Sequence, residues 1–216
     1  MNIVGLITEY NPFHNGHLYH IQEAKRVTGA DAAVVIMSGN FVQRGTPAIM
    51  PKHLRAKAAL LSGADLVLEL PVCFATGSAE FFAMGAVALL DSLGCIDSIC
   101  FGSECGDSKT LGKIARILAE EPDDYKTVLQ DALRKGVSFP QARQTALTQY
   151  FDMPSTDPDR ISSVNAKTVA AILSQPNNIL GIEYMKALYK RNSSMKAYSI
   201  KRIGASYHES ELTESY

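Results

Sequence analysis

Short apolar runs alternate with segments of helical periodicity along the first half of the chain. Residues 2–7 and 31–37 are rich in valine and isoleucine, which favours strands, and apolar side chains recur at helical spacing over residues 16–29 between them. This order predicts a strand, a helix and a second strand. Two more apolar runs predict strands at 64–70 and 96–102.

Two further helices separate the later strands. Residues 51–63 and 77–94 have helical periodicity, and each segment ends at a glycine. Nearly continuous apolar strands that alternate with helices predict an α/β fold, a Rossmann-like parallel sheet with helices on both faces. Ligands bind such sheets beyond the carboxyl ends of the strands, where the strand order reverses. The residues that follow each strand are therefore the first candidates for function.

The second half of the chain has a different character. Residues 108–174 are mixed in charge and predict a mostly helical insertion with a solvated outer face. A helix at 176–190 and a strand at 195–204 then complete the core. We therefore divide the chain into a nucleotide-binding core (1–107), the insertion, and the completion of the core (175–216).

The segment after the first strand carries the candidate chemistry, because it contains HNGH from His14 to His17. Backbone N–H groups in the first turn of a helix favour an anion, and Gly16 removes a Cβ that would block the approach of phosphate. Imidazoles at this position can stabilise the charge that builds on an α-phosphate during nucleophilic attack. The pattern predicts a nucleotide site with an α-phosphate at this turn.

A structural interpretation of the same histidines stays open. His14 can be a surface residue, His17 an ordinary helix residue and His20 a ring half buried under a loop. The position directly after a strand, with the turn fixed by residues 11–13, favours the functional interpretation.

The loop after the second strand offers further contacts. Asn40, Gln43 and Arg44 are possible substrate or phosphate contacts, since arginine grips phosphate or a small carboxylate with a planar fork. The alternative is a loop held by its own hydrogen bonds. Lys52 and Arg55 stand one turn apart on the next helix and face either the cleft or the solvent.

Composition excludes several classes of protein. The net charge of −1 argues against a protein that coats nucleic acid through bulk charge. The four cysteines lack the paired spacing of a zinc site, so we expect reduced, mostly buried thiols and no metal held by the protein. No signal peptide and no apolar run long enough to span a bilayer is present, which predicts a cytoplasmic protein with no membrane partner. The oligomeric state cannot be predicted.

The HNGH turn resembles the HxGH signature of the class I nucleotidyltransferase and aminoacyl-tRNA synthetase superfamily. Longer motifs are similar to those of one family, the bacterial tRNA(Met) cytidine acetate ligases: EYNPFHNGHLYHI, MSGNFVQRGTPAI, GADLVLELP, CFGSE, PNNILGIEY and IKRIGASYH. The resemblance implies the nucleotidyltransferase type of Rossmann-like fold. It also implies a ligase that activates acetate with ATP as acetyl-adenylate and acetylates N4 of the wobble cytidine of elongator tRNA(Met).

The resemblance assigns roles to individual residues. His14 and His17 become the catalytic residues, ATP is a substrate that Mg²⁺ accompanies, and Asn177 or Asn178 contacts ATP. At Gly102, the end of the fourth strand, we expect the ring or ribose of ATP to pass closely. The expected ATP contacts are Ile7, Thr8, Glu9, Tyr10, Asn11, Pro12, Phe13, His14, Asn15, Gly16, His17, Leu18, Tyr19, His20, Gly102, Asn178 and Arg202.

One expected motif is absent from the sequence. The superfamily carries a second phosphate motif, a Ser/Thr-rich turn with a basic residue, which we expect after GASYH at residues 204–208. We therefore expect a chain truncated before a C-terminal part, whose catalytic competence is an open question. The segment ISSVNAK (161–167) imitates this motif, although a serine-capped helix explains it better.

The run from Lys186 to Arg202 has six basic residues and no acidic one, so it can form part of a tRNA track or merely a solvated face. Two other functions stay open at this point. One is a small-molecule adenylyltransferase, and the other is a nucleotide-binding or RNA-binding module without chemistry.

Overall fold

The computed structural model describes residues 1–154 and 164–202, and its centre is a five-stranded parallel sheet in the order β3-β2-β1-β4-β5. All four strand pairs are parallel. The strands are β1 (Ile3–Thr8), β2 (Ala32–Ser38), β3 (Leu66–Leu70), β4 (Ser98–Ser103) and β5 (Lys196–Lys201). The predicted fold class is confirmed, because the order reverses between β1 and β4 as in doubly wound sheets.

The predicted elements are confirmed, with small shifts at their ends. The first two strands begin and end one residue later than the apolar runs, because pairing continues to Thr8 and Ser38. The later helices match well: α2 (Lys52–Leu61), α4 (Ala79–Ser92) and α10 (Pro176–Arg191). Two short helices were not predicted, a 3₁₀ turn η1 (Gln43–Gly45) and α3 (Val72–Ala75), and both lie in segments expected to be loops.

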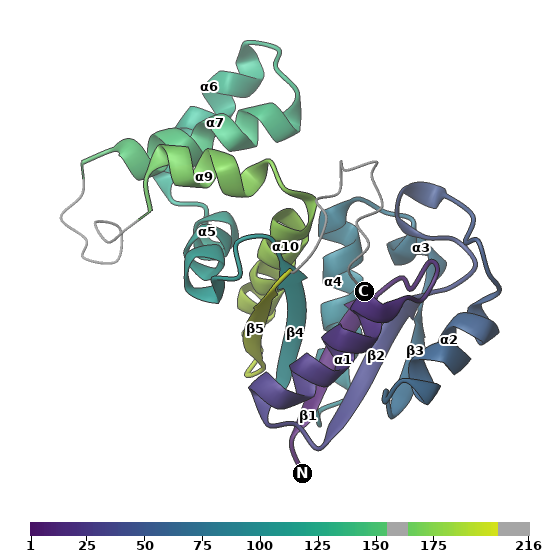
Figure 1. Cartoon of the computed structure of the whole chain (residues 1–216). Helices are drawn as coiled ribbons and strands as arrows, with labels where there is room; N and C mark the ends of the chain where they lie inside the picture. The colour runs from purple at the N-terminus through teal and green to yellow at the C-terminus, as the bar shows by residue number, and fades with distance from the viewer. Residues whose placement is uncertain (155–163, 203–216) are drawn as a thin grey trace, which may run out of the picture.

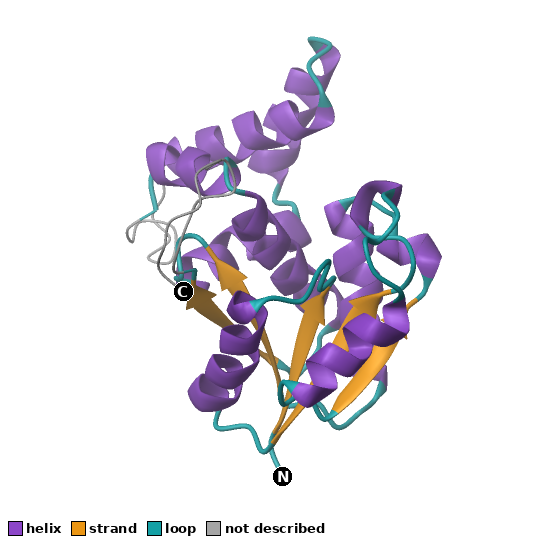
Figure 2. Cartoon of the chain, turned by 45° about the vertical axis from the view of Figure 1, so that its right-hand side comes forward, coloured by secondary structure: helices purple, strands orange, loops and turns teal. Residues whose placement is uncertain are grey.

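Helices cover both faces of the sheet, as Figures 1 and 2 show. Helix α1 (Asn15–Thr28) and α2 lie on one face, where Val4, Leu6 and Ile21 belong to one apolar cluster. On the other face α4 and α10 pack on a larger cluster that includes Ile36 and Leu90. Alternation along each strand sends successive side chains to the two clusters. The outer strand β3 is less well covered, since Leu66 is 43% exposed.

Gly5 shows how closely α4 approaches the sheet. A Cβ at this position would lie 2.7 Å from Cδ1 of Leu90, which is a clash with a fully buried side chain. The strand therefore needs glycine here, so that the helix can pack against β1.

The predicted insertion contains four described helices: α5 (Ser108–Glu120), α6 (Asp123–Arg134), α7 (Phe139–Asp152) and α9 (Ala166–Leu173). Helix α5 packs against α10, while α6, α7 and α9 form an arm above the carboxyl ends of the strands (Figure 1). Asn165, rather than a serine, caps α9 with its side chain. Residues 161–163 of the ISSVNAK segment, and the GASYH segment, lie outside the described residues.

The cysteine prediction is only partly correct. All four thiols are free, but Cys73 and Cys95 are exposed and Cys105 is half-buried, so only Cys100 is buried. Cys73 and Cys95 lie near helix ends at the surface, where apolar character does not enforce burial. Within residues 1–154 and 164–202, no helix combines the length and the apolar character that crossing a membrane requires.

Candidate active site

The turn between β1 and α1 is built around His14, which is the N-cap residue of the helix. Its Nδ1 accepts a hydrogen bond from the backbone N–H of Gly16 at 3.1 Å. The Nδ1 of His17 in turn accepts from the backbone N–H of His14 at 3.3 Å. The two histidines thus form a reciprocal capping box, in which side chains satisfy N–H groups that the helix itself cannot.

This pattern fixes the proton positions of the two neutral rings. A nitrogen that accepts a hydrogen bond carries no proton, so the proton of each neutral imidazole lies on Nε2. The rings of His14 and His17 stack with their centroids 3.7 Å apart, and Phe13 and Tyr10 pack around His17. Two Nε2–H donors are therefore held side by side at the N-terminus of α1.

Two backbone N–H groups that the sequence offers to an anion are not available to one in the structure. The N–H groups of His14 and Gly16 are already bonded to the imidazoles, so the rings offer donors to an anion in this arrangement. Glycine is needed at position 16 for local packing, and not only for the approach of phosphate. A Cβ there would lie 3.0 Å from Cε1 of His14, so glycine makes room for the capping ring.

Buried polar atoms without a partner gather near this turn. His20 Nε2 and Ser38 Oγ have no hydrogen-bond partner among the described residues, and Thr8 Oγ1 and Tyr10 Oη have none there except each other. Thr8 ends β1, Tyr10 is in the turn that follows, His20 is in α1, and Ser38 ends β2. Buried polar groups are nearly always satisfied, so unpaired ones at the carboxyl end of a sheet favour a site for a polar ligand or water.

Arg202 follows β5 and completes this end of the sheet. Its backbone N–H donates to the carbonyl oxygen of Ser103 at 3.0 Å, next to Gly102. Burial lowers the pKa of His14, that of His17 to about 3 and that of His20 to about 4. The charge of Arg202 acts in the same direction on all three, after the effects of His14 and His20 in the case of His17. The structure thus brings the predicted residues of β1, β4 and β5 together around neutral histidines.

The remaining residues predicted in the first loop have varied surroundings. Ile7 packs against the α4 side of the core, and Asn11 Oδ1 accepts from the N–H of Ile49 at 2.7 Å. The peptide bond between Asn11 and Pro12 is cis. No side-chain hydrogen bond to another described residue involves Asn15, Leu18 or Tyr19, and Tyr19 is 42% exposed.

The loop after β2 is attached to the first loop. The N–H of Gln43 donates to Oε1 of Glu9 at 2.6 Å, and burial raises the pKa of Glu9. Asn40 is exposed, with its carbonyl oxygen accepting from Ala48. Arg44 is exposed and has φ of 67°, a left-handed conformation that non-glycine residues rarely adopt. The side-chain contacts predicted for this loop stay predictions.

Arg55 holds the two loops together. Its guanidinium is buried and donates to the carbonyl oxygens of Glu9 at 2.5 Å, Ser38 at 3.1 Å, Gly39, and Met50 at 3.0 Å. Lys52 instead pairs with Glu69 at 2.5 Å. The sequence left open whether the Arg55 side chain faces the cleft or the solvent. It faces neither, because the guanidinium is buried, where it positions the two loops.

Glu104 was missed as a cap for α10. Its carboxylate accepts from the backbone N–H groups of Asn177 at 3.3 Å and Asn178 at 2.9 Å, and from Nδ2 of Asn177 at 2.7 Å. Both asparagines lie inside the first turn of α10, which begins at Pro176, so Glu104 and not an asparagine side chain satisfies these N–H groups. Asn178 is buried and accepts from the N–H of Cys105 at 3.1 Å. A groove of about 430 Å³ beside this residue opens between the exit of β4 and α9.

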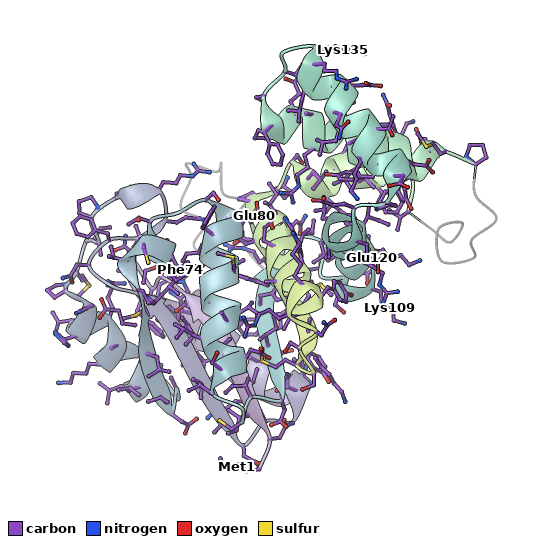
Figure 3. The ribbon with its side chains drawn as sticks, turned by 180° about the vertical axis from the view of Figure 1, so that it is seen from behind. Met1, Phe74, Glu80, Lys109, Glu120 and Lys135 are labelled. Atoms are coloured by element: carbon purple, nitrogen blue, oxygen red, sulfur yellow. The ribbon has the colours of Figure 1, made fainter. Side chains whose placement is uncertain are left out.

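The basic run from Lys186 to Arg202 is not one exposed track. Lys186 is buried and pairs with Glu80 at 2.7 Å and Glu183 at 3.5 Å, and Arg191 pairs with Asp91 at 2.9 Å. Glu80 is labelled in Figure 3 at the top of α4, beside α10. The sequence could not show this pairing, because both partners lie about 100 residues earlier in the chain.

Comparison with known proteins places these features in a family. The HIGH Nucleotidyl Transferase family matches residues 1–216. The chain is 51% identical to the tRNA(Met) cytidine acetate ligase of Acetivibrio thermocellus over all of its length, and 49% identical to that of Clostridium perfringens. It covers 49% and 52% of these proteins, so it spans about half the length of the curated relatives it matches.

Two solved structures of Thermotoga maritima TmcAL are similar throughout the fold. The structure bound with alpha-thio ATP has a TM-score of 0.87 and 46% sequence identity. The match covers 94% of this chain and 47% of the chain in that structure. The apo structure has a TM-score of 0.90 and 44% sequence identity. The match covers 99% of this chain and 48% of the chain in that structure.

Proposed function

Because this chain belongs to the HIGH nucleotidyl transferase family, we propose that it binds ATP at the carboxyl ends of β1 and β4 and activates acetate for transfer to elongator tRNA(Met). The stacked pair of His14 and His17 at the N-terminus of α1 is the observation that carries this proposal. The similarity to proteins named tRNA(Met) cytidine acetate ligase supports the choice of acetate and tRNA.

In the first step an acetate oxygen attacks the α-phosphorus of ATP. The bond between the α-phosphorus and the bridging oxygen breaks, and acetyl-adenylate and pyrophosphate form. Negative charge builds on the non-bridging oxygens of the α-phosphate, and neutral imidazoles can donate their Nε2–H groups to these oxygens. The positive end of the α1 dipole favours the same charge.

In the second step the N4 amine of the wobble cytidine attacks the carbonyl carbon of the acetyl group. AMP leaves with the former acetate oxygen, and the amine loses a proton as the amide forms. Acetyl-adenylate is a reactive mixed anhydride, so a site that excludes water protects it from hydrolysis. The arm of α6, α7 and α9 stands at the same end of the sheet, above its β4–β5 edge (Figure 1).

Other residues have narrower roles in this proposal. Arg202 neutralises phosphate charge next to the histidines, and Arg44 binds the carboxylate of acetate or a phosphate. The ribose or adenine passes Gly102, where only hydrogen atoms stand out from the backbone. Mg²⁺ accompanies ATP, since this ion is usually bound through phosphate oxygens rather than by an all-protein cage. A cytoplasmic location, where ATP, acetate and tRNA occur together, belongs to the proposal.

The proposal can be tested by transfer of labelled acetate. The chain is incubated with ATP, ¹⁴C-acetate and elongator tRNA(Met) transcript, and label in precipitated RNA is counted. We expect ATP-dependent labelling that disappears when the wobble cytidine is replaced by uridine, which lacks the N4 amine. Equal labelling of both transcripts, or no labelling beside measurable acetyl-adenylate, would contradict transfer to that cytidine.

A further inference from the structure

Basic side chains gather on α5 and at the end of β5, at the edge of the sheet nearest Arg202. Residues 108–119 include Lys109, Lys113 and Arg116 and no acidic residue, although the whole chain has a net charge of −1. The three positions are spaced by four and three residues, so they share one face of α5. The opposite face is buried, with Leu111, Ile114 and Leu118 in the core.

Lys201 joins this helix face to the end of β5. A Cβ at Gly106, just before α5, would lie 2.6 Å from Cβ of Lys201, so the two segments are in direct contact. Lys201 is exposed, and Figure 3 shows Lys109 at the outer side of α5. We call the four residues Lys109, Lys113, Arg116 and Lys201 the α5 basic face.

The end of β5 connects the α5 basic face with the candidate active site. Lys201 and Arg202 are consecutive, and successive side chains of an extended strand point to opposite sides. Lys201 lies against Gly106 on the α5 side, while Ile200 belongs to the same apolar cluster as Ile21 of α1. Alternation therefore places Arg202 on the α1 side, with the histidines. A polyanion that lies on α5 therefore reaches the histidines across one strand end.

Three carboxylates of the described residues near the α5 basic face lie at helix ends. Asp107 accepts from the N–H of Lys109 at 2.9 Å and from Thr110 Oγ1 at 2.6 Å, and Glu104 caps α10. Glu120 lies 4.0 Å from Arg116 at the far end of the helix. Arg116 is thus partly paired, and the two exposed lysines Lys109 and Lys201 carry the charge that the test below removes.

We propose that the α5 basic face binds the phosphate backbone of the RNA substrate and directs it to the site beside Arg202. This inference rests on the proposed function, which supplies RNA as the acceptor. Lysines and arginines along one helix face neutralise successive phosphates and release their counterions, so binding must weaken as salt increases. Of the basic run from Lys186 to Arg202, Lys201 belongs to this face, whereas Lys186 and Arg191 are paired within the protein.

The test uses fluorescence anisotropy of a labelled tRNA(Met) anticodon stem-loop at several KCl concentrations. We compare the chain with K109Q/K201Q and with K57Q, which removes an exposed charge from α2 at the other edge of the sheet. The double variant should bind the RNA at least several-fold more weakly, and its slope of log K against log salt should be smaller by about 1.4–1.8. K57Q should match the original chain.

Binding of a fluorescent ATP analogue is measured with the same variants. Retained ATP binding beside weakened RNA binding supports the assignment of the α5 basic face. Unchanged RNA affinity and slope in K109Q/K201Q, the same loss in K57Q, or no RNA binding by the original chain would overturn it. Failure of the original chain to bind ATP would instead contradict the proposed function, so the two failures are distinguishable.

Discussion

The rings of His14 and His17 stack 3.7 Å apart, and each ring uses Nδ1 to accept a backbone N–H from the same turn. Each imidazole ring therefore has two roles. The Nδ1 atoms satisfy the helix end, and the Nε2–H groups remain as donors for a ligand. Substitutions that imitate one nitrogen but not the other can separate the structural role from the catalytic one.

His14→Asn should keep the helix cap and lose catalysis. Asparagine is a good N-cap, so its Oδ1 can accept from Gly16 in place of Nδ1, but it has no group at the position of Nε2. We expect stability within about 1 kcal/mol of the original chain and a loss of about 10²–10³ in the rate of acetyl-adenylate formation, as for a lost oxyanion donor.

His14→Gln is the matched variant, since its amide nitrogen can reach the position of Nε2. It should retain more activity than His14→Asn while capping the helix less well. Urea unfolding and single-turnover adenylate formation measure the two properties. Equal rates for the asparagine and glutamine variants would show that the Nε2–H group of His14 does not act on the phosphate.

Stability should decrease as the pH falls below about 6.5. The folded state lowers the pKa of His17 to about 3 and of His20 to about 4, chiefly through burial, whereas a histidine in the unfolded chain titrates near 6.5. Between these values the unfolded state binds more protons, so the free energy of unfolding is lost as the pH falls. The expected slope is about 1.4 kcal/mol per pH unit for each fully coupled histidine.

Urea unfolding from pH 7 to pH 4.5 measures this dependence. His20→Gln should reduce the slope, while His53→Gln on the exposed surface of α2 serves as the control and should leave it unchanged. A slope that is the same in all three proteins would mean that burial of His20 does not hold it neutral.

Arg55→Met should destabilise the protein and weaken ATP binding together. The substitution leaves the carbonyl oxygens of Glu9, Ser38 and Gly39 without their shared donor. Hydrogen bonds to charged groups contribute about 1.5–3 kcal/mol each, so we expect a loss of at least that size in urea unfolding. Lys57→Met, two residues along α2 at an exposed position, is the control. A well-folded Arg55→Met protein with normal ATP affinity would contradict the positioning role.

Arg44→Lys should impair turnover while leaving the fold intact. Lysine keeps the charge but cannot form the two parallel hydrogen bonds of a guanidinium with a carboxylate or phosphate. The side chain is exposed, so stability should change by less than about 0.5 kcal/mol. Kinetics close to those of the original chain would show that Arg44 contributes only to the structure of the loop.

The sequence predicted the sheet well, because apolar strands and periodic helices are local patterns. It also located the HNGH turn correctly, since a cap, a glycine and a helix start are adjacent in the chain. The reciprocal capping by His14 and His17 could not be predicted from these patterns. Residue type alone does not show which ring nitrogen accepts a hydrogen bond.

Long-range contacts account for the errors. Arg55 binds carbonyl oxygens up to 46 residues away, and Glu104 caps a helix that begins more than 70 residues later. Lys186 looks like a surface cation in the sequence, but the fold buries it against Glu80. A charged residue on an amphipathic helix gives no local sign of such a partner, so its role depends on the tertiary structure.

Acetate-dependent exchange of labelled pyrophosphate into ATP tests the central claim most directly. Only activation of a carboxylate makes the return of pyrophosphate depend on that carboxylate. We predict that the chain catalyses exchange when acetate and Mg²⁺ are present, that omission of acetate abolishes it, and that replacing both His14 and His17 by alanine abolishes it. Exchange that proceeds equally without acetate, or that survives in the double variant, would contradict the assignment of this site to acetate activation.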